Sequence, residues 1–172
     1  GDESPIKFPW RGARSFIDPE SGKIDMSRCI GLRYFMEKAK GYGCENFLLF
    51  SNTPPIGMTK NSSYHKTEPD FRSNLKEDCY DDFAEYLAEV AKRLSDGGYN
   101  IKYIRPVNEP SWKWTTDIQE GTPWLNPEIK RLAVELDKSI QKRGLETKIF
   151  LPEADSIQNI YGSERFQKDN PN

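Results

Sequence analysis

The residue best suited to chemistry is a glutamate between an asparagine and a proline, at residues 108–110. It follows an apolar run, residues 101–107, that predicts a strand. The proline fixes the chain after the strand, so Glu109 would be presented rigidly into a cleft. Partial burial raises the pKa of a carboxyl, as a general acid near neutral pH requires, and Asn108 can hydrogen-bond a substrate hydroxyl. The alternative is a strand-end glutamate that pairs with a lysine.

Tryptophans and a polar turn are the candidate binding residues. Trp112, Trp114 and Trp124 lie in the loop after the predicted strand. Aromatic faces stack on apolar C–H surfaces such as those of a sugar ring, although the same side chains can instead pack a loop onto the protein. We favour Trp112 and Trp114 for binding because they are closer in sequence to the glutamate. Ser51 and Asn52 follow the preceding apolar run and are predicted to face the same cleft.

A repeating order of helix and strand positions these residues. Helical spacing predicts helices from Ser27 to Gly41, from Asp78 to the glycine pair 97–98, and from Asn126 to Gly144. Asp78 and Asn126 are the expected N-cap residues. Short apolar runs predict strands over residues 47–50, 101–107 and 148–151. The run at 47–50 has no polar alternation, which is typical of a strand covered on both faces.

Strands that alternate with helices predict a parallel sheet with right-handed crossovers. The loops after the strands are long, as at the functional end of a (β/α)₈ barrel or a doubly wound sheet. No glycine-rich phosphate-binding motif follows a strand, which favours the barrel. Three strands cannot close a barrel of eight, so the chain is either a small open sheet or a piece of a larger domain.

Composition excludes several classes of protein. The chain has 172 residues, a net charge of −2 with acids and bases interspersed, and a mean hydropathy of −0.81. It therefore shows no nucleic-acid footprint, and no stretch approaches the roughly 18 apolar residues of a membrane span. One histidine and three cysteines without a CxxC pair argue against a zinc site. Three reduced cysteines are favoured over one disulfide and a free thiol.

Several motifs in one order resemble glycoside hydrolase family 30, most closely its endo-β-1,6-galactanase-like members. They are Trp10–Arg14, Phe50–Pro55, Met58–Asn61, Pro106–Pro110, Gln119–Trp124 and Leu151–Ala154. Together they cover essentially the whole chain. Gly57 departs from the pattern, because a bulky residue is expected before Met58.

The resemblance implies a retaining glycosidase with a (β/α)₈ catalytic domain. Residues 1–172 would then be a central part of that domain, lacking its first and last strands. It also implies that Glu109 is the general acid/base and that Asn108 binds the sugar near its 2-hydroxyl. The family nucleophile is a second glutamate on the seventh strand, which would lie outside this chain. Glu153, on the neighbouring strand end, is expected to be a subsite or structural residue.

The resulting hypothesis is a fragment of a retaining endo-glycosidase that cleaves β-linked galactan, with β-1,6 linkages favoured. The resemblance implies a polysaccharide or oligosaccharide substrate, no metal or other cofactor, and a secreted or periplasmic location. The chain alone is expected to be inactive and to self-associate through exposed sheet edges. The alternatives are a non-catalytic carbohydrate-binding or structural fragment, and the same family chemistry on xylan, β-1,6-glucan or glucosylceramide.

Overall fold

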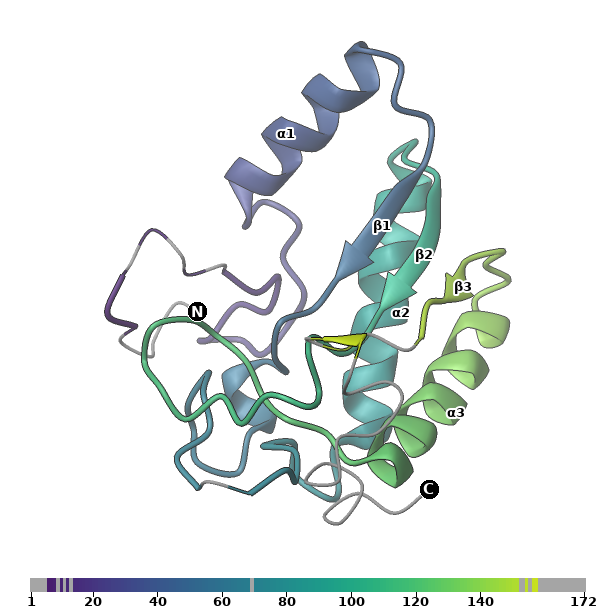
Figure 1. Cartoon of the computed structure of the whole chain (residues 1–172). Coiled ribbons are helices and arrows are strands. Elements are labelled where there is room, and N and C mark those ends of the chain that lie inside the picture. The colour runs from purple at the N-terminus through teal and green to yellow at the C-terminus, as the bar shows by residue number, and fades with distance from the viewer. Residues whose placement is uncertain are drawn as a thin grey trace.

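The computed structural model describes residues 6–8, 10, 12, 14–68, 70–151, 154, 156 and 157. The elements in order are α1 (Ile30–Gly41), β1 (Phe47–Phe50), the short 3₁₀ helix η2 (Ile56–Met58), α2 (Tyr80–Asp96), β2 (Ile101–Arg105), α3 (Asn126–Lys142) and β3 (Lys148–Ile149). The strands form one sheet in the order β1-β2-β3 (Figure 1). This confirms the predicted alternation of helices and strands.

Both strand pairs are parallel. Leu49 of β1 is opposite Ile104 of β2, which in turn is opposite Ile149 of β3. The register shifts after the first pair of β1, so that the pairing is irregular at the start of the sheet. Backbone pairing continues past the strand ends, because the Ser51 amide donates to the Arg105 carbonyl at 3.1 Å.

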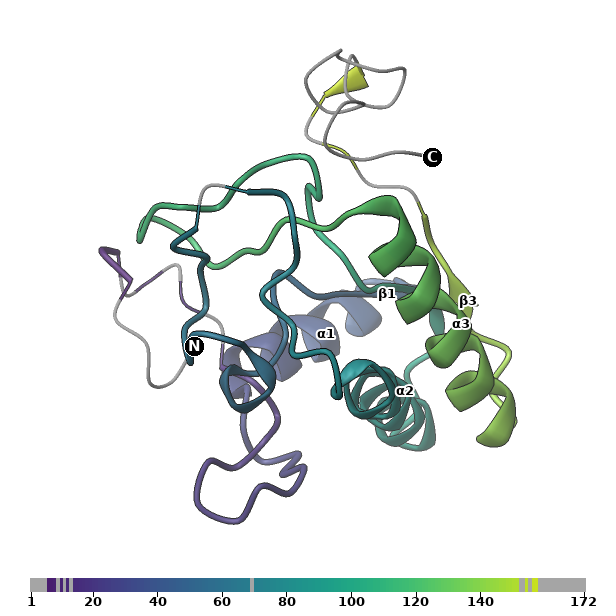
Figure 2. The same cartoon turned by 90° about the horizontal axis from the view of Figure 1, so that it is seen from below.

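Helices α2 and α3 lie side by side over one face of the sheet (Figure 2). The apolar residues that recur at helical spacing along α2 are all buried, namely Phe83, Leu87, Val90, Ala91 and Leu94. On α3, the residues that meet it are Leu132, Leu136 and Ile140, which are also buried. Burial of side chains of this kind contributes about 1.5–3 kcal/mol each. The core therefore lies between these two helices and the sheet.

The other face of the sheet is open in the described part of the chain. Leu48 and Phe50 of β1 are 42% and 44% exposed, and Phe150 beyond β3 is 45% exposed. The described residues therefore cover the run at 47–50 on one face only, and the predicted cover of its second face is not formed by this part of the chain. An apolar run reports which side chains favour burial, but it does not supply the element that covers them.

Helix α1 also leaves much of its apolar surface exposed. Leu32, Phe35, Met36 and Ala39 are its apolar residues at helical spacing. Of these only Met36 is buried, whereas Leu32 is 48% and Phe35 is 71% exposed. Figure 1 shows α1 standing apart from the packed pair α2 and α3. Its helical spacing was read correctly, but the surface expected to cover it is not formed by the described residues.

Helix starts differ from the predictions by one to a few residues. Helix α2 begins at Tyr80 with Cys79 as its N-cap, so Asp78 is not the capping residue. Helix α3 begins with Asn126 itself, and the N-cap is Leu125. Helix α1 begins at Ile30, because residues 25–28 form a turn in which the Ser27 amide donates to the Asp25 carboxylate at 2.8 Å.

Two strands are shorter than predicted. Strand β2 ends at Arg105 because Pro106 has no amide hydrogen to continue the ladder. Strand β3 covers only residues 148–149, although the Phe150 amide still donates to the Ile104 carbonyl at 2.9 Å. None of the three cysteines is paired in a disulfide in this structure. No helix among the described residues has both the length and the apolar character needed to cross a membrane.

A group of ion pairs joins α2 to the end of α3. Arg143 donates to the carboxylates of Glu85 and Glu89, and Ser139 adds a hydrogen bond to Glu85 at 3.1 Å. The hydrogen bond from Arg143 is the main reason that the pKa of Glu85 is held at about 2, below its usual value of 4.5. Ionised Glu85 therefore stabilises the folded state.

We expect this stabilisation to be lost in acid. A carboxyl whose pKa is lower in the folded state contributes its stability above the unfolded pKa, near 4.5, and loses it as the pH falls toward 2. The free energy of unfolding of Glu85→Gln should therefore lie below that of the wild type at pH 7, and the two should converge between pH 4.5 and pH 2. Chemical denaturation across this range measures the difference. A gap independent of pH would contradict the assignment.

Candidate active site

The two longest loops gather where the strands end. Residues 51–79 follow β1 and residues 106–125 follow β2, and both lie at the arrowhead end of these strands (Figure 1). The bond from the Ser51 amide to the Arg105 carbonyl holds the two strand ends together. The structure therefore brings Ser51 and Asn52 to the same edge of the sheet as the Asn-Glu-Pro motif at 108–110.

Glu109 lies in a tight turn after β2. It is partly buried, while Asn108 beside it is only 6% exposed. The Glu109 carbonyl accepts two hydrogen bonds, from the Trp112 amide at 3.0 Å and from the Trp114 indole nitrogen at 3.1 Å. The turn thus places an acidic residue just past the end of β2, as the sequence predicted. The two hydrogen bonds to its carbonyl hold the Glu109 backbone in place.

The Glu109 backbone has a φ of 41°, which lies in the left-handed region. Left-handed backbone costs a residue with a Cβ about 1–2 kcal/mol relative to glycine. A non-glycine residue in this conformation is typical of a functional site, where the surrounding structure holds the strain. Glu109 shares the left-handed region with Cys29, Ser62 and Trp114, and its strain is one that the surrounding turn must hold.

This strain predicts a stability difference between two variants that both lack the carboxyl. Glu109→Gly should be more stable than Glu109→Ala by about 1 kcal/mol, because only alanine keeps the strained Cβ. Urea denaturation of both variants measures the difference. Equal stabilities would show that residue 109 is not held in the left-handed region in solution.

The tryptophans of this loop differ in exposure. Trp112 is 56% exposed, whereas Trp114 and Trp124 are 6% and 1% exposed. Trp124 stacks on Phe83 of α2 with ring centroids 6.5 Å apart. Trp112 therefore offers an accessible aromatic face beside Glu109, while the other two rings pack the loop onto the protein.

The polar residues after β1 are partly accessible. Ser51 and Asn52 are both of intermediate exposure, and the Ser51 hydroxyl donates to the Thr53 carbonyl at 3.1 Å. The hydroxyl oxygen can still accept a hydrogen bond. Glu153, the remaining candidate, lies outside the described residues.

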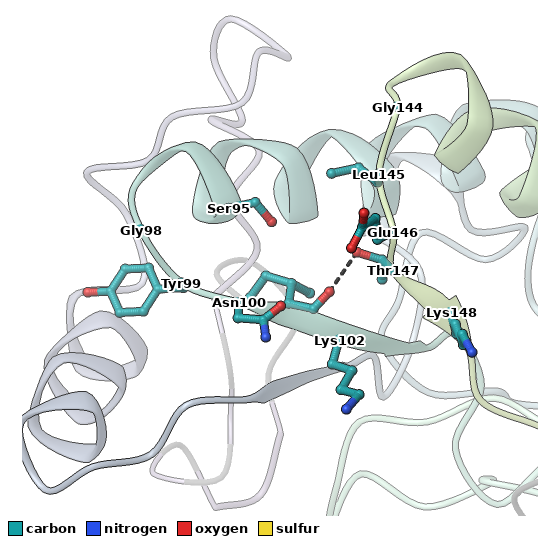
Figure 3. A pocket seen from close by; sticks show the side chains of 11 residues that line it. Ser95, Gly98, Tyr99, Asn100, Lys102, Gly144, Leu145, Glu146, Thr147 and Lys148 are labelled. Atoms are coloured by element: carbon teal, nitrogen blue, oxygen red, sulfur yellow. Dashed lines mark hydrogen bonds between the residues drawn. The ribbon is translucent and has the colours of Figure 1, made fainter.

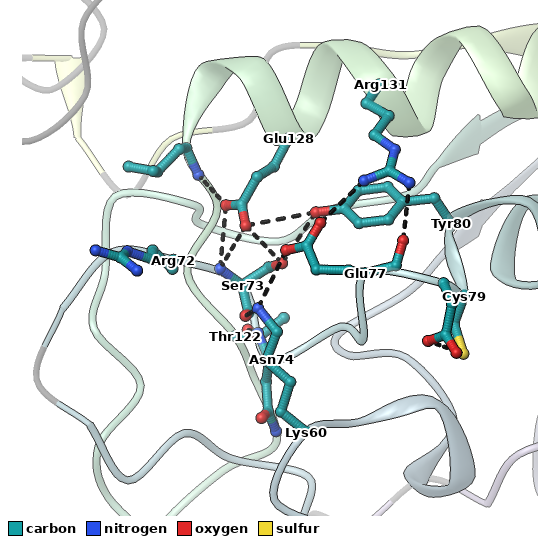
Figure 4. Close-up of polar contacts among 12 residues, drawn as sticks. Lys60, Arg72, Ser73, Asn74, Glu77, Cys79, Tyr80, Thr122, Glu128 and Arg131 are labelled. Atoms are coloured by element: carbon teal, nitrogen blue, oxygen red, sulfur yellow. Dashed lines mark hydrogen bonds and ion pairs between the residues drawn. The ribbon is translucent and has the colours of Figure 1, made fainter.

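A carboxylate at the start of α3 ties the two loops together (Figure 4). Glu128 accepts hydrogen bonds from the Ser73 amide at 3.0 Å, from the Ser73 hydroxyl at 3.0 Å and from the Leu125 amide at 2.8 Å. Burial is the main reason that the pKa of Tyr80, whose hydroxyl also meets Glu128, rises to about 12. One side chain therefore caps α3 and anchors the loop after β1.

A second polar tie crosses between the same loops. The Asn74 backbone amide donates to the Thr122 hydroxyl at 2.7 Å. Within the loop after β1, the Asn74 side-chain amide donates to the Asn61 side-chain oxygen at 2.6 Å. Asn74 and Thr122 are 1% and 0% exposed, so the bond between them forms without competing water. The sequence patterns did not point to Glu128, Asn74 or Thr122 as residues that hold the two loops together. Only Glu128 had a readable signal, as an acidic residue in the first turn of a helix.

A shallow hollow lies at the other end of the sheet (Figure 3). It is lined by the segments that precede β2 and β3, including Asn100 and Glu146. There the Thr147 hydroxyl donates to the Ile101 carbonyl at 2.6 Å. The hollow is thus separated from Glu109 by the length of β2. In barrels of parallel strands, active sites lie at the carboxyl ends of the strands, and residues at the amino ends contribute to stability. Among the described residues, no group of three His, Cys, Asp or Glu could hold a metal ion.

Comparison with known proteins identifies the family. The family model described as O-glycosyl hydrolase family 30 matches residues 1–170. The chain belongs to this family. An endo-β-1,6-galactanase from Hypocrea rufa is 28% identical over 148 residues, which are 84% of this chain and 29% of the galactanase. The family 30 resemblance drawn from the motifs is thereby confirmed.

Solved structures share the fold of this chain. A conserved exported protein from Bacteroides fragilis superposes with a TM-score of 0.90 and 32% identity over 98% of this chain and 34% of its own. The catalytic domain of a family 30 xylanase C from Talaromyces cellulolyticus has a TM-score of 0.61 and 15% identity over 80% of this chain and 32% of its own. The chain thus spans about a third of these proteins.

The fold is therefore part of a (β/α)₈ barrel, as predicted. In such a barrel the helices form the outer ring and side chains from all strands fill the interior. The sheet face opposite α2 and α3 is then the interior face. This explains why Leu48, Phe50 and Phe150 are apolar and exposed, because the interior layers need side chains from the other strands.

Proposed function

We propose that this chain is the part of a retaining glycoside hydrolase that carries the general acid/base, Glu109, and that the substrate is a β-linked galactan with β-1,6 linkages. One observation carries the proposal. In a family 30 chain, the Asn-Glu-Pro motif lies at the carboxyl end of a parallel strand with Glu109 held in a strained backbone conformation. The named activity of the Hypocrea rufa relative supports galactan as the substrate.

Retention of configuration uses two carboxyl groups about 5–5.5 Å apart. In the first step Glu109 gives its proton to the glycosidic oxygen as the C–O bond breaks, and a carboxylate nucleophile bonds to the anomeric carbon. In the second step Glu109 takes a proton from water, whose oxygen displaces that carboxylate. The nucleophile in this proposal is a glutamate outside this chain, so we expect the chain alone to be inactive.

The neighbouring residues would bind the sugar. Asn108 lies directly before the acid and can hydrogen-bond a sugar hydroxyl near the reacting carbon. Trp112 is the exposed ring beside it and is proposed as a stacking platform. Ser51 and Asn52 would supply polar contacts from the neighbouring strand end, and Glu153 stays a candidate subsite residue. The two carboxylates carry out the chemistry, so the mechanism requires no metal or other cofactor.

The location follows from the substrate. A polymeric glycan is met outside the cytoplasm, and the Bacteroides fragilis relative is described as exported. A secreted or periplasmic location is therefore part of the proposal.

A second candidate is a non-catalytic fragment that binds sugar or associates with itself. It is favoured by the exposed apolar side chains on the open sheet face and on α1, such as Phe50 and Phe35. Size-exclusion chromatography at several concentrations tests the association. A monomer at every concentration would contradict self-association through these surfaces or through the sheet edges.

The test of the proposed function is the release of reducing sugar from β-1,6-galactan, with xylan and β-1,6-glucan as parallel substrates and glucosylceramide hydrolysis as a fourth. Two proteins are assayed, namely the chain alone and a fusion in which residues 1–172 replace the matched segment of the Bacteroides fragilis protein. We expect release by the fusion, none by the chain alone, and none by the fusion carrying Glu109→Gln. Release by the Glu109→Gln fusion at the wild-type rate would refute the role of Glu109.

A further inference from the structure

We propose that Trp114 and Gly121 are positioning residues for Glu109. The indole of Trp114 holds the Glu109 backbone in its left-handed conformation, and the absence of a side chain at residue 121 is what allows the ring to lie there. This inference rests on the proposed acid/base role of Glu109. It assigns Trp114 a task different from the sugar contact expected from the sequence.

The first observation is the contact between the ring and the turn. The Trp114 indole nitrogen donates to the Glu109 carbonyl at 3.1 Å, and the ring is 6% exposed. Both residues have a positive φ, 41° at Glu109 and 54° at Trp114. A turn with two strained residues needs contacts that hold it, and this hydrogen bond from a buried ring acts directly on the carbonyl of the strained glutamate.

The second observation concerns Gly121. A Cβ placed on Gly121 would lie 2.1 Å from Cδ2 and 2.2 Å from Cε3 of the Trp114 ring. Gly121 is not among the residues with positive φ, so its backbone does not require glycine. The glycine is therefore needed for space, because the ring rests against its Cα.

The third observation is that the neighbouring loop holds both residues in place. The Lys66 amide donates to the Trp114 carbonyl at 3.0 Å, and the Gly121 amide donates to the Tyr64 carbonyl at 2.8 Å. Tyr64 and Lys66 belong to the loop after β1 and are 5% and 4% exposed. The ring thus lies in a slot fixed by two loops, which makes it a rigid support for the turn that carries Glu109.

A structural role without positioning gives a different expectation. If Trp114 only fills space, then Trp114→Phe costs stability and leaves the Glu109 backbone unchanged, since phenylalanine keeps an aromatic ring. If the indole N–H positions Glu109, this variant changes the Glu109 conformation in a protein that is still folded. The discriminating readout is therefore local to residue 109 and does not depend on activity.

The experiment uses NMR of the isotope-labelled chain. The Glu109 Cα shift and HN–Hα coupling report φ, its carbonyl shift reports the hydrogen bond, and its Cδ shift reports the carboxyl. We expect Trp114→Phe to move these signals, while Trp112→Phe, at an exposed ring, leaves them in place. Signals from the α2 core show whether each variant is folded.

The second variant acts from the other side of the ring. Gly121→Ala should shift the same Glu109 signals, whereas Gly57→Ala should not, because a Cβ on Gly57 meets nothing within 4 Å. The Glu109 signals of the double variant Gly121→Ala/Trp114→Ala should differ little from those of Trp114→Ala alone, since the two substitutions act through one ring. Wild-type Glu109 signals in folded Trp114→Phe and Gly121→Ala would overturn the proposal.

Kinetics of the fusion give the functional readout. Loss of positioning should lower kcat of Trp114→Phe by about tenfold and leave KM within about twofold, because the misplaced acid acts in the transition state. An unchanged kcat beside shifted Glu109 signals would overturn the functional part of the inference. A fully active Glu109→Gln fusion would refute the proposed function. The NMR measurements would still show whether Trp114 and Gly121 hold the Glu109 backbone in its left-handed conformation.

Discussion

Replacing Glu109 by glutamine is expected to slow the hydrolysis of a natural β-galactoside linkage by about 10²–10⁴-fold in the fusion. Glutamine keeps the size and the hydrogen-bonding reach of the side chain but cannot give or take the proton. The substitution also keeps the Cβ, so the left-handed backbone at residue 109 is equally strained in both proteins. A loss of activity therefore reports proton transfer and not a change in packing.

The leaving group of the substrate sharpens this prediction. An aryl galactoside with an acidic phenol needs no proton to depart, so the first step should be nearly as fast in Glu109→Gln as in the wild type. The second step still lacks its base, and a burst of phenol should therefore precede a slow steady state. Equal slowing of both substrates in the first step would contradict general acid catalysis by Glu109. Asp117→Asn, at an exposed carboxylate of the same loop, controls for loss of a loop carboxylate.

Removing the Glu128 side chain is expected to destabilise the fold by about 2–3 kcal/mol. Glu128→Ala breaks the hydrogen bonds to Ser73 and Leu125, including the cap of α3, and hydrogen bonds to a charged group contribute about 1.5–3 kcal/mol. The Ser73 amide, on a residue that is 1% exposed, is left without its acceptor. Urea denaturation measures the free energy of unfolding, and hydrogen exchange at Ser73 reports the loop.

Glu77→Ala is the matched control for Glu128→Ala. Glu77 makes two ionic contacts, with Arg131 at 3.0 Å and Lys60 at 3.6 Å, but its side chain is 70% exposed. Exposed ion pairs contribute about 0–1 kcal/mol, so this variant should lose little stability. Similar losses in the two variants would show that the buried network around Glu128 does not hold the loops together.

The network matters for the site because it continues toward the acid. Asn74, next to Ser73, is bonded to Thr122, which adjoins Gly121. Gly121 in turn supports the Trp114 ring whose indole reaches the Glu109 carbonyl. The loop after β1 therefore stabilises the turn after β2, and the two strand ends act as one unit.

The sequence by itself determined the order of elements and the candidate acid. Apolar residues at helical spacing located α2 and its buried face, because this periodicity directly reflects which side of a helix meets the core. The Asn-Glu-Pro motif lies just past a strand end for an equally local reason, because Pro106 before it has no amide hydrogen and stops the ladder of β2. Neighbouring residues are enough for inferences of this kind.

Only the tertiary structure decided how the site is supported. The sequence could not separate Trp112 from Trp114, because the exposure of each ring depends on a glycine at 121 and on a loop about 50 residues earlier in the chain. The left-handed backbone at Glu109 was equally unreadable, since glutamate rarely adopts it and distant contacts impose it. The open face of the sheet likewise depends on which strands are present to cover it, and this is a property of the assembled barrel and not of any one strand.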